Sequence, residues 1–329
     1  MHAGPSFADL PGSAVPGSGG REQSTDDGCA IVAALTDPLA STVVVGPPAA
    51  TPGSWAGAPS ALLVDGMFWL AYRLRRPIGQ GRGYANVIAR SDDGERFDTV
   101  AVIHRETFGA ASLERPMLTR PDAGRWRLYV SCATPGTFGW RVDLLEAGTA
   151  EGLATAAPAP MLPGSARWAV KDPVVLHADD RWHLWASCHP LDDLVNTDRM
   201  ITAHATSTDG ATWRWCGTAL QGRAEHWDGR GARITTVLPN GRAAVAFYDG
   251  RATAEENWEE RTGVAVSRTG LDHAFTPVGD GPVAQSPHAG GGLRYLSVVV
   301  LPDGGYRLYF ELTRPDGAHE LRTRLVPAP

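Results

Sequence analysis

The sequence predicts an all-β fold: a single five-bladed β-propeller with four-stranded antiparallel blades, its ring closed by an N-terminal strand. Two observations lead to this prediction. One pattern, an apolar strand followed by a polar turn and a strand of alternating large and small residues, occurs five times between residue 55 and the end of the chain. The repeats are also 57 to 63 residues apart, which leaves room for four short strands in each.

The turns of the five repeats define the blades. They lie at Asp65, Asp122, Asp179, Asn240 and Asp303. Several repeats continue with a second hairpin, as in "NVIARSDDGERFDTV" and "ITAHATSTDGATWRWCG", which supplies a third and a fourth strand. No segment with helical periodicity of useful length competes with these strands. We therefore expect four successive strands in each complete blade.

The last repeat has only three strands, near residues 293–300, 306–312 and 319–326, before the sequence ends. Because an unpaired strand edge invites aggregation, a propeller must cover the terminal edges of its blades. The apolar segment "STVVVG", which precedes the first repeat, can supply the missing strand. We therefore expect residues 43–45 to pair with residues 321–325.

The N-terminal region differs in composition from the rest of the chain. Its start is rich in Gly, Ser and Pro, so we expect residues 1–35 to form a flexible leader and residues 36–329 to form the propeller domain. This leader has neither the basic start nor the apolar segment of a secretory signal. A cytoplasmic location is therefore expected.

The overall composition limits the possible partners. The formal net charge of -6 opposes binding to nucleic acid or to an anionic membrane surface. No apolar run approaches the roughly 20 residues that span a bilayer. The four cysteines and ten histidines show no close metal-ligand spacing. We expect neither a metal nor a cofactor, and no feature of the sequence specifies an oligomeric state.

The innermost strands of a propeller line a central channel, and their starting ends converge at one mouth. Residues six to eight positions before each turn should therefore face one another. These segments are Gly57-Ala58-Pro59, Glu114-Arg115-Pro116, Lys171-Asp172-Pro173, Ala232-Arg233-Ile234 and Tyr295-Leu296-Ser297. Loops that enter the same region add Glu225, Asp228 and Arg230 before the fourth blade and Arg294 before the fifth.

The carboxylates expected at this mouth suggest acid/base chemistry. Carboxylates held apart across a pocket with aromatic walls suit the hydrolysis of glycosides. Lys171 should keep Asp172 ionised, whereas burial among tryptophans should raise the pKa of Glu114 and make it the proton donor. Asp228 is the alternative donor. An Asp-Pro step at a strand start can also be turn chemistry alone. The candidate ligand-binding residues are Trp55, Arg115, Lys171, Glu225, Trp227, Arg230, Asp249 and Arg294.

The order of the strand starts, with "KDPVVL" in the third repeat, resembles the five-bladed glycosidases: the family 43 arabinanases and xylosidases and the family 32 invertases. "SLERPMLT" in the second repeat is similar to the Glu-Asp-Pro-Arg segment of the family 130 mannoside phosphorylases and hydrolases. The resemblance in architecture covers nearly all of the chain beyond the leader, whereas the matching sequence motifs are short. It implies that Asp172 is the Asp that orients and tunes the site, and that Arg294 binds substrate.

The sequence also departs from the pattern of these families. They carry an Asp base or nucleophile in the first blade, where this sequence has Ala58 in "WAGAPSALL". Their fourth blade carries a Glu acid before a proline, where "EHWDGRGARITTV" offers Glu225 or Asp228. Arg115 replaces the Asp of the family 130 segment. The resemblance therefore implies that the scaffold is kept and that the usual catalytic triad is not.

These observations lead to one expected function and two alternatives. We expect a glycosidase-related enzyme that acts on a small glycoside or sugar-like ligand by carboxylate acid/base chemistry. The alternatives are a non-catalytic carbohydrate-binding propeller, and a biosynthetic enzyme that uses the same pocket for another acid/base reaction.

Overall fold

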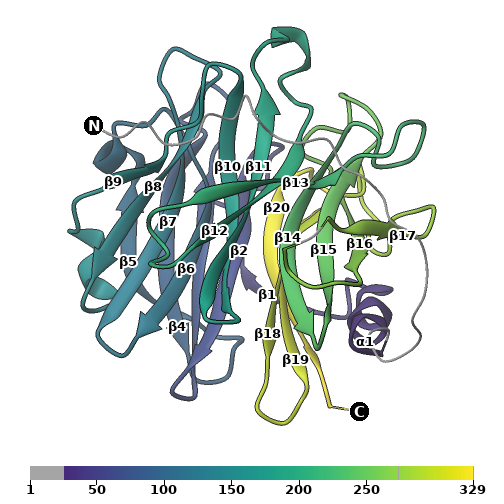
Figure 1. Cartoon of the computed structure of the whole chain (residues 1–329), viewed down its shortest axis with the longest axis horizontal. Coiled ribbons are helices and arrows are strands. Elements are labelled where there is room, and N and C mark those ends of the chain that lie inside the picture. Colours follow the sequence, from purple (N-terminus) through teal and green to yellow (C-terminus); the bar gives the residue numbers. More distant parts are fainter. Residues whose placement is uncertain (1–25, 273, 329) are drawn as a thin grey trace.

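The computed structural model describes residues 26–272 and 274–328, whose strands form three four-stranded sheets and one eight-stranded sheet (Figure 1). The eight-stranded sheet combines two units of four strands, the first and the fifth, so the described residues contain five such units. The first unit contains β2 (Trp55–Val64), β3 (Met67–Arg75), β4 (Gly83–Ser91) and β5 (Asp98–His104). The second contains β6 (Leu113–Asp122), β7 (Arg125–Ala133), β8 (Trp140–Ala147) and β9 (Ala159–Leu162). The third contains β10 (Trp168–Ala178), β11 (Arg181–Pro190), β12 (Ile201–Ser207) and β13 (Arg214–Gln221).

The fourth unit contains β14 (Gly231–Asn240), β15 (Ala243–Arg251), β16 (Arg261–Ser267) and β17 (Thr276–Val278). The fifth contains β18 (Leu293–Val300), β19 (Tyr306–Thr313), β20 (His319–Val326) and β1 (Thr42–Val45). Helical structure is limited to α1 (Asp26–Leu35) and the short 3-10 turns η2 (Arg105–Phe108), η3 (Glu151–Ala154) and η4 (Leu194–Asn196) in the part of the chain that the structure describes. The predicted all-β fold is confirmed.

The predicted pairing of the two ends of the domain is also confirmed. Strand β1 pairs antiparallel with β20, with Val43 opposite Arg322 and Val45 opposite Leu321. One parallel bridge, between Trp55 and His319, connects this fifth unit to the first. The apolar edge that the last repeat would otherwise expose is therefore covered by a strand from the N-terminal side of the domain.

The apolar residues pack between neighbouring units. Five clusters of buried side chains each combine residues of two adjacent units, and one of them joins the fifth unit to the first through residues such as Leu70, Tyr309 and Leu321. The innermost strands β2, β6, β10, β14 and β18 contact one another in that order, and β18 contacts β2. Strand alternation therefore produces two apolar faces per unit, as a ring of packed sheets requires.

Helix α1 differs from the expected flexible leader over residues 1–35. Residues 26–35 form this helix, and Ile31 and Leu35 are fully buried against Val245, Phe247 and Leu308 of the fourth and fifth units. The apolar run "AIVAAL" explains the docking, because it places two large side chains four positions apart on one helix face. Residues 1–25 lie outside the described residues. Within residues 26–272 and 274–328, no helix combines the length and apolarity needed to cross a bilayer.

Candidate functional site

The starts of the five inner strands meet at a cavity of about 500 Å³. Each inner strand carries an irregularity in its pairing near this end, as a β-bulge produces. At three of these bulges Ala58, Asp172 and Tyr295 adopt left-handed backbone angles, with φ of 52°, 54° and 57°. Bulges bend a strand and turn side chains out of the regular alternation, which directs them toward the mouth of the channel. The strand-start residues that line the cavity are Trp55, Glu114, Lys171, Arg233, Arg294 and Tyr295.

Tryptophan side chains and loop residues form the walls of the cavity. Trp55 and Trp258 meet edge to face with their ring centroids 5.8 Å apart, and Trp140 lines the cavity from the second unit. The Arg75 guanidinium lies 3.8 Å from the centre of the Trp55 ring and 4.9 Å from that of Trp258. These contacts combine flat apolar surface with positive charge, and such walls suit a ring-shaped ligand with polar substituents.

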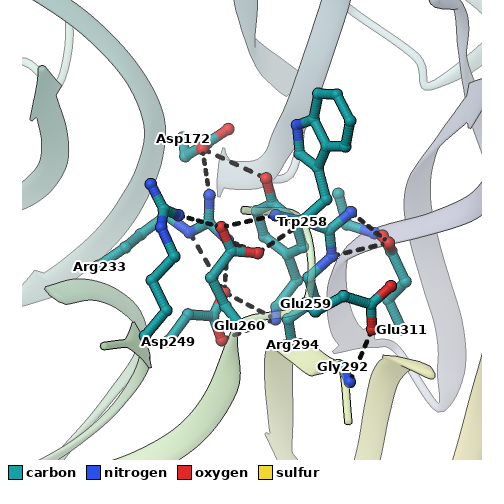
Figure 2. Close-up of polar contacts among 12 residues, drawn as sticks. Asp172, Arg233, Asp249, Trp258, Glu259, Glu260, Gly292, Arg294 and Glu311 are labelled. Carbon is teal, nitrogen blue, oxygen red and sulfur yellow. Dashed lines mark hydrogen bonds and ion pairs between the residues drawn. The ribbon is translucent and has the colours of Figure 1, made fainter. Parts of the chain in front are cut away.

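Glu311 belongs to a buried ion-pair network beside the residues that line the cavity (Figure 2). Its carboxylate accepts hydrogen bonds from Arg73 (2.9 Å), from Arg294 (2.9 and 2.7 Å) and from the backbone N–H of Ala58 (2.9 Å). Burial alone would raise the pKa of Glu311, but the charges of Arg294 and Arg73 hold it well below its ordinary value. This carboxylate is therefore ionised at neutral pH.

Asp172 forms a second part of the network. Its carboxylate accepts hydrogen bonds from Arg233 (3.0 Å) and the Tyr295 hydroxyl (3.3 Å), and the Lys171 ammonium lies 3.6 Å away. Burial opposes ionisation, yet the charges of Lys171 and Arg233 lower the pKa of Asp172. Arg233 also donates to Asp249, whose pKa burial raises to about 6 in spite of this contact.

The three carboxylates that line the cavity are all paired with arginines. Glu114 forms an ion pair with Arg73 and lies 3.6 Å from Arg75. Glu260 contacts Arg294 at 2.8 Å and also pairs with Arg251. Burial would raise the pKa of Glu260, and these arginines lower it well below its ordinary value. The third carboxylate, Asp198, is held by Arg230 at 2.6 Å.

The structure brings part of the predicted site together. Of the residues singled out from the sequence, Trp55, Glu114, Lys171 and Arg294 line the cavity. Asp172 and Asp249 do not line it, but both contact Arg233, which does. Arg230 does not line the cavity, but it forms an ion pair with Asp198, which does.

Four other predicted residues lie elsewhere. The buried Asp228 carboxylate contacts Arg223 and the hydroxyl of Tyr248 at 2.7 Å, and Trp227 stacks on the same tyrosine. These local partners turn both side chains away from the cavity. Glu225 is exposed to solvent. Arg115 points along the channel to the carbonyl oxygens of Pro59 and Thr235, where it lines a second cavity of about 350 Å³.

Several residues of the network were not predicted from the sequence, and they lie mainly on the second strand of a unit. Arg73 lies opposite Gly57 in the first hairpin, and Glu311 lies opposite Arg294 in the fifth. The strand-start residues were found by counting back from each hairpin turn. Arg73 and Glu311 lie the same number of positions after their turns, so counting forward would have indicated them. Glu260 belongs to the acidic segment "AEENWEERT", whose composition is that of a solvated loop, although Glu260 itself is buried.

Ala58 is the residue at which the resemblance to the glycosidase families implies an Asp. It is fully buried, and Glu311 fills the adjacent space: a Cβ atom built on the neighbouring Gly57 would lie 2.0 Å from a Glu311 oxygen. The first inner strand therefore contributes no carboxylate to the cavity. The carboxylate nearest to this position in the network comes from Glu311 on β19.

Comparison with known proteins reveals similarity at the level of structure. No protein-family model matches the sequence, and neither does any curated protein. A glycosyl hydrolase from Bacteroides ovatus has a TM-score of 0.59 and 13% sequence identity, over 87% of this chain and 94% of that one. The GH43_1 enzyme from Xanthomonas citri complexed with xylotriose has a TM-score of 0.59 and 14% identity, over 89% and 92%.

Sucrose-6-phosphate hydrolase from Lactobacillus gasseri has a TM-score of 0.61 and 14% identity, over 92% of this chain and 64% of that one. A protein from a study of GH130 mannoside phosphorylases and hydrolases has a TM-score of 0.56 and 14% identity, over 89% and 94%. At these identities the similarity concerns the fold. The chain therefore has the β-propeller fold of the family 43, 32 and 130 glycosidases, as the sequence resemblance indicated.

Proposed function

We propose that this protein is a glycosidase-related enzyme that binds a small glycoside or sugar-like molecule in the mouth cavity and processes it by carboxylate acid/base chemistry. The observation that carries the proposal is the cavity itself. Its volume of about 500 Å³ lies in the usual range for small-molecule sites. It combines tryptophan walls with the ionisable side chains of Glu114, Lys171 and Glu260.

Glu114 is our candidate for the group that accepts a proton or attacks the ligand. Its carboxylate lines the cavity, forms an ion pair with Arg73 and lies 3.6 Å from Arg75. This role differs from that of the proton donor expected from the sequence, because arginines as well as tryptophans surround the carboxylate. Lys171 is the candidate donor, since burial lowers its pKa to about 8, close to neutral pH.

Asp172 is a positioning residue in this proposal. It contacts Lys171 and Arg233, which both line the cavity, but does not line it. Its negative charge fixes the two cations and offsets the cost of burying them. This role agrees with the orienting function that the resemblance to the third-blade Asp implies.

A non-catalytic carbohydrate-binding propeller is the second candidate, and two observations favour it. Ala58 removes the carboxylate of the first strand, and each cavity-lining carboxylate is held by at least one arginine. Ion pairs of this kind fix side chains well but restrict their use as proton carriers. Turnover, and not binding, separates this candidate from the proposed enzyme.

The test is the turnover of a panel of aryl glycosides by the wild-type protein and by Glu114→Gln, Asp172→Asn and Glu225→Gln. We expect Glu114→Gln to lower kcat by about 10²-fold or more, the usual effect of losing an acid/base group. Asp172→Asn should lower kcat more than it raises KM, because it misplaces Lys171 without removing a wall of the cavity. The matched control Glu225→Gln changes an exposed carboxylate outside the cavity and should retain full turnover.

Two outcomes would contradict the proposal. Full turnover by both Glu114→Gln and Asp172→Asn would refute the assigned roles. Glycan binding by the wild-type protein without turnover of any panel member would establish the binding propeller instead. Circular dichroism melting of each variant checks that a loss of turnover does not come from a loss of folding.

A further inference from the structure

The charged groups that line the cavity are not balanced. Among the described residues, five cations and three carboxylates line it, and an arginine already holds each of these carboxylates. The lining cations are Arg82, Lys171, Arg233, Arg251 and Arg294. Arg233, Arg251 and Arg294 each have a carboxylate partner within 3.3 Å. Lys171 lies farther from its carboxylate partner, 3.6 Å from Asp172, so Arg82 is the lining cation without a carboxylate partner among the described residues.

Arg82 has no anionic partner within residues 26–272 and 274–328. Its guanidinium makes no hydrogen bond or ion pair with any residue that the structure describes, and its Nε atom is buried. The loop between β3 and β4 fixes its backbone, since the carbonyl of Arg82 accepts the N–H of Arg76 at 2.9 Å. Burial and the nearby charge of Arg73 lower the pKa of Arg82. A partly buried cation in this state is costly unless an anion approaches it.

Lys171 and Arg75 extend this positive region. The Lys171 ammonium lies 3.6 Å from the Asp172 carboxylate, which also contacts Arg233, and 4.9 Å from the centre of the Trp140 ring. None of the three Arg75 nitrogens has a hydrogen-bond partner among the described residues. The charge of Arg82 contributes to lowering the pKa of both residues, after the larger effect of burial. These cations therefore lie close enough to repel one another.

We propose that the ligand carries an anionic group, a carboxylate or a phosphate, which binds to Arg82 beside Lys171. The inference rests on the proposed function, because it describes a substituent of the sugar-like molecule placed in the cavity. Guanidinium groups bind both anions through charge-assisted hydrogen bonds, and an ammonium adds a point charge. An anion at this position would supply the hydrogen-bond acceptor that Arg82 lacks and would reduce the repulsion among the three cations.

The test measures the affinity of the full-length protein for matched probes by isothermal titration calorimetry. Each set contains a neutral methyl glycoside, the corresponding hexuronate and the corresponding hexose 6-phosphate, for glucose, mannose and galactose, and inorganic phosphate is measured alone. We expect at least one anionic sugar to bind about tenfold or more tightly than its neutral counterpart. A preference for the uronate or for the phosphate identifies which anion the site accepts.

Arg82→Gln should remove this preference and bring the anionic sugar to within about twofold of the neutral glycoside. The matched control is Arg76→Gln, because Arg76 begins the same loop, is exposed and stacks on Tyr84 away from the cavity. It should leave all affinities unchanged. Melting curves of both variants confirm that they are folded.

The outcomes separate the two proposals. Neutral glycosides that bind as tightly as anionic ones, or a preference that survives Arg82→Gln, would overturn the anion site and leave the proposed function intact. Binding of inorganic phosphate without binding of any sugar would support the anion site and contradict the sugar-like ligand. Binding of none of the probes would contradict both.

Discussion

Replacing Glu311 by Gln should destabilise the protein far more than the loss of an ordinary salt bridge. The Glu311 side chain is inaccessible to solvent and accepts hydrogen bonds from Arg73, Arg294 and the Ala58 N–H. Glutamine has nearly the same shape but no charge, and its amide NH₂ must face at least one of these donors. Breaking a buried ion pair on one side costs about 3–5 kcal/mol, because the remaining charges stay buried without compensation.

Urea and thermal unfolding followed by circular dichroism measure this loss. At roughly 1.5–2 °C per kcal/mol for a domain of this size, the melting temperature of Glu311→Gln should fall by about 5–10 °C. The matched control is Glu95→Gln. Glu95 contacts Arg307 at 3.1 Å with 44% of its side chain exposed, so its loss should cost about 0–1 kcal/mol. Equal destabilisation by the two substitutions would refute the view that the buried network stabilises the ring.

The effect should also depend on pH. The folded-state pKa of Glu311 is well below its ordinary value of 4.5. The carboxylate therefore contributes stability that is fully present above the unfolded-state pKa and is lost as the pH falls through the folded-state pKa. The stability difference between wild type and Glu311→Gln should accordingly be constant from pH 6 to pH 8 and should narrow below about pH 4. A difference that grows on acidification would contradict this assignment.

Three further predictions concern the termini and the cavity. Deleting residues 1–46 removes β1 from the edge of β20 and should lower the melting temperature below that of a protein that lacks only residues 1–40. Identical melting temperatures of the two truncated proteins would show that β1 does not stabilise the ring. Leu35→Ala should cost about 2–5 kcal/mol in urea unfolding because its side chain is buried against the fifth unit, and a cost below about 0.5 kcal/mol would show that α1 is not docked in solution. The pKa of Lys171 is lowered to about 8, so this side chain loses its positive charge between pH 7 and pH 9. The dissociation constant of an anionic sugar should therefore rise over this pH range in the wild type but not in Lys171→Gln. The charged and titratable groups around this ammonium are Asp172, Glu260, Arg233, Arg82 and His189.

Local patterns in the sequence were enough to predict the architecture. Five polar turns at similar spacing, each between an apolar strand and an alternating one, define the blades, because turn chemistry and side-chain alternation act over a few residues. The three strands of the last repeat left one edge open, and residues 43–45 were the apolar segment that could fill it. The meeting of Glu114, Lys171 and Arg294 at one mouth followed from the topology, since inner strands of a ring start at the same end.

Only the tertiary structure decided which charged side chains pair and which face the cavity. Asp228 lies three residues before an inner strand, yet Arg223 and Tyr248 hold it away from the cavity. Glu311 lies 253 residues from Ala58 in sequence and fills the space beside it. Such pairings depend on distances between side chains of different blades and on how each bulge turns a residue, and neither quantity follows from spacing along the chain. The fold is therefore encoded in short-range periodicity, whereas the site depends on contacts that exist only once the ring has closed.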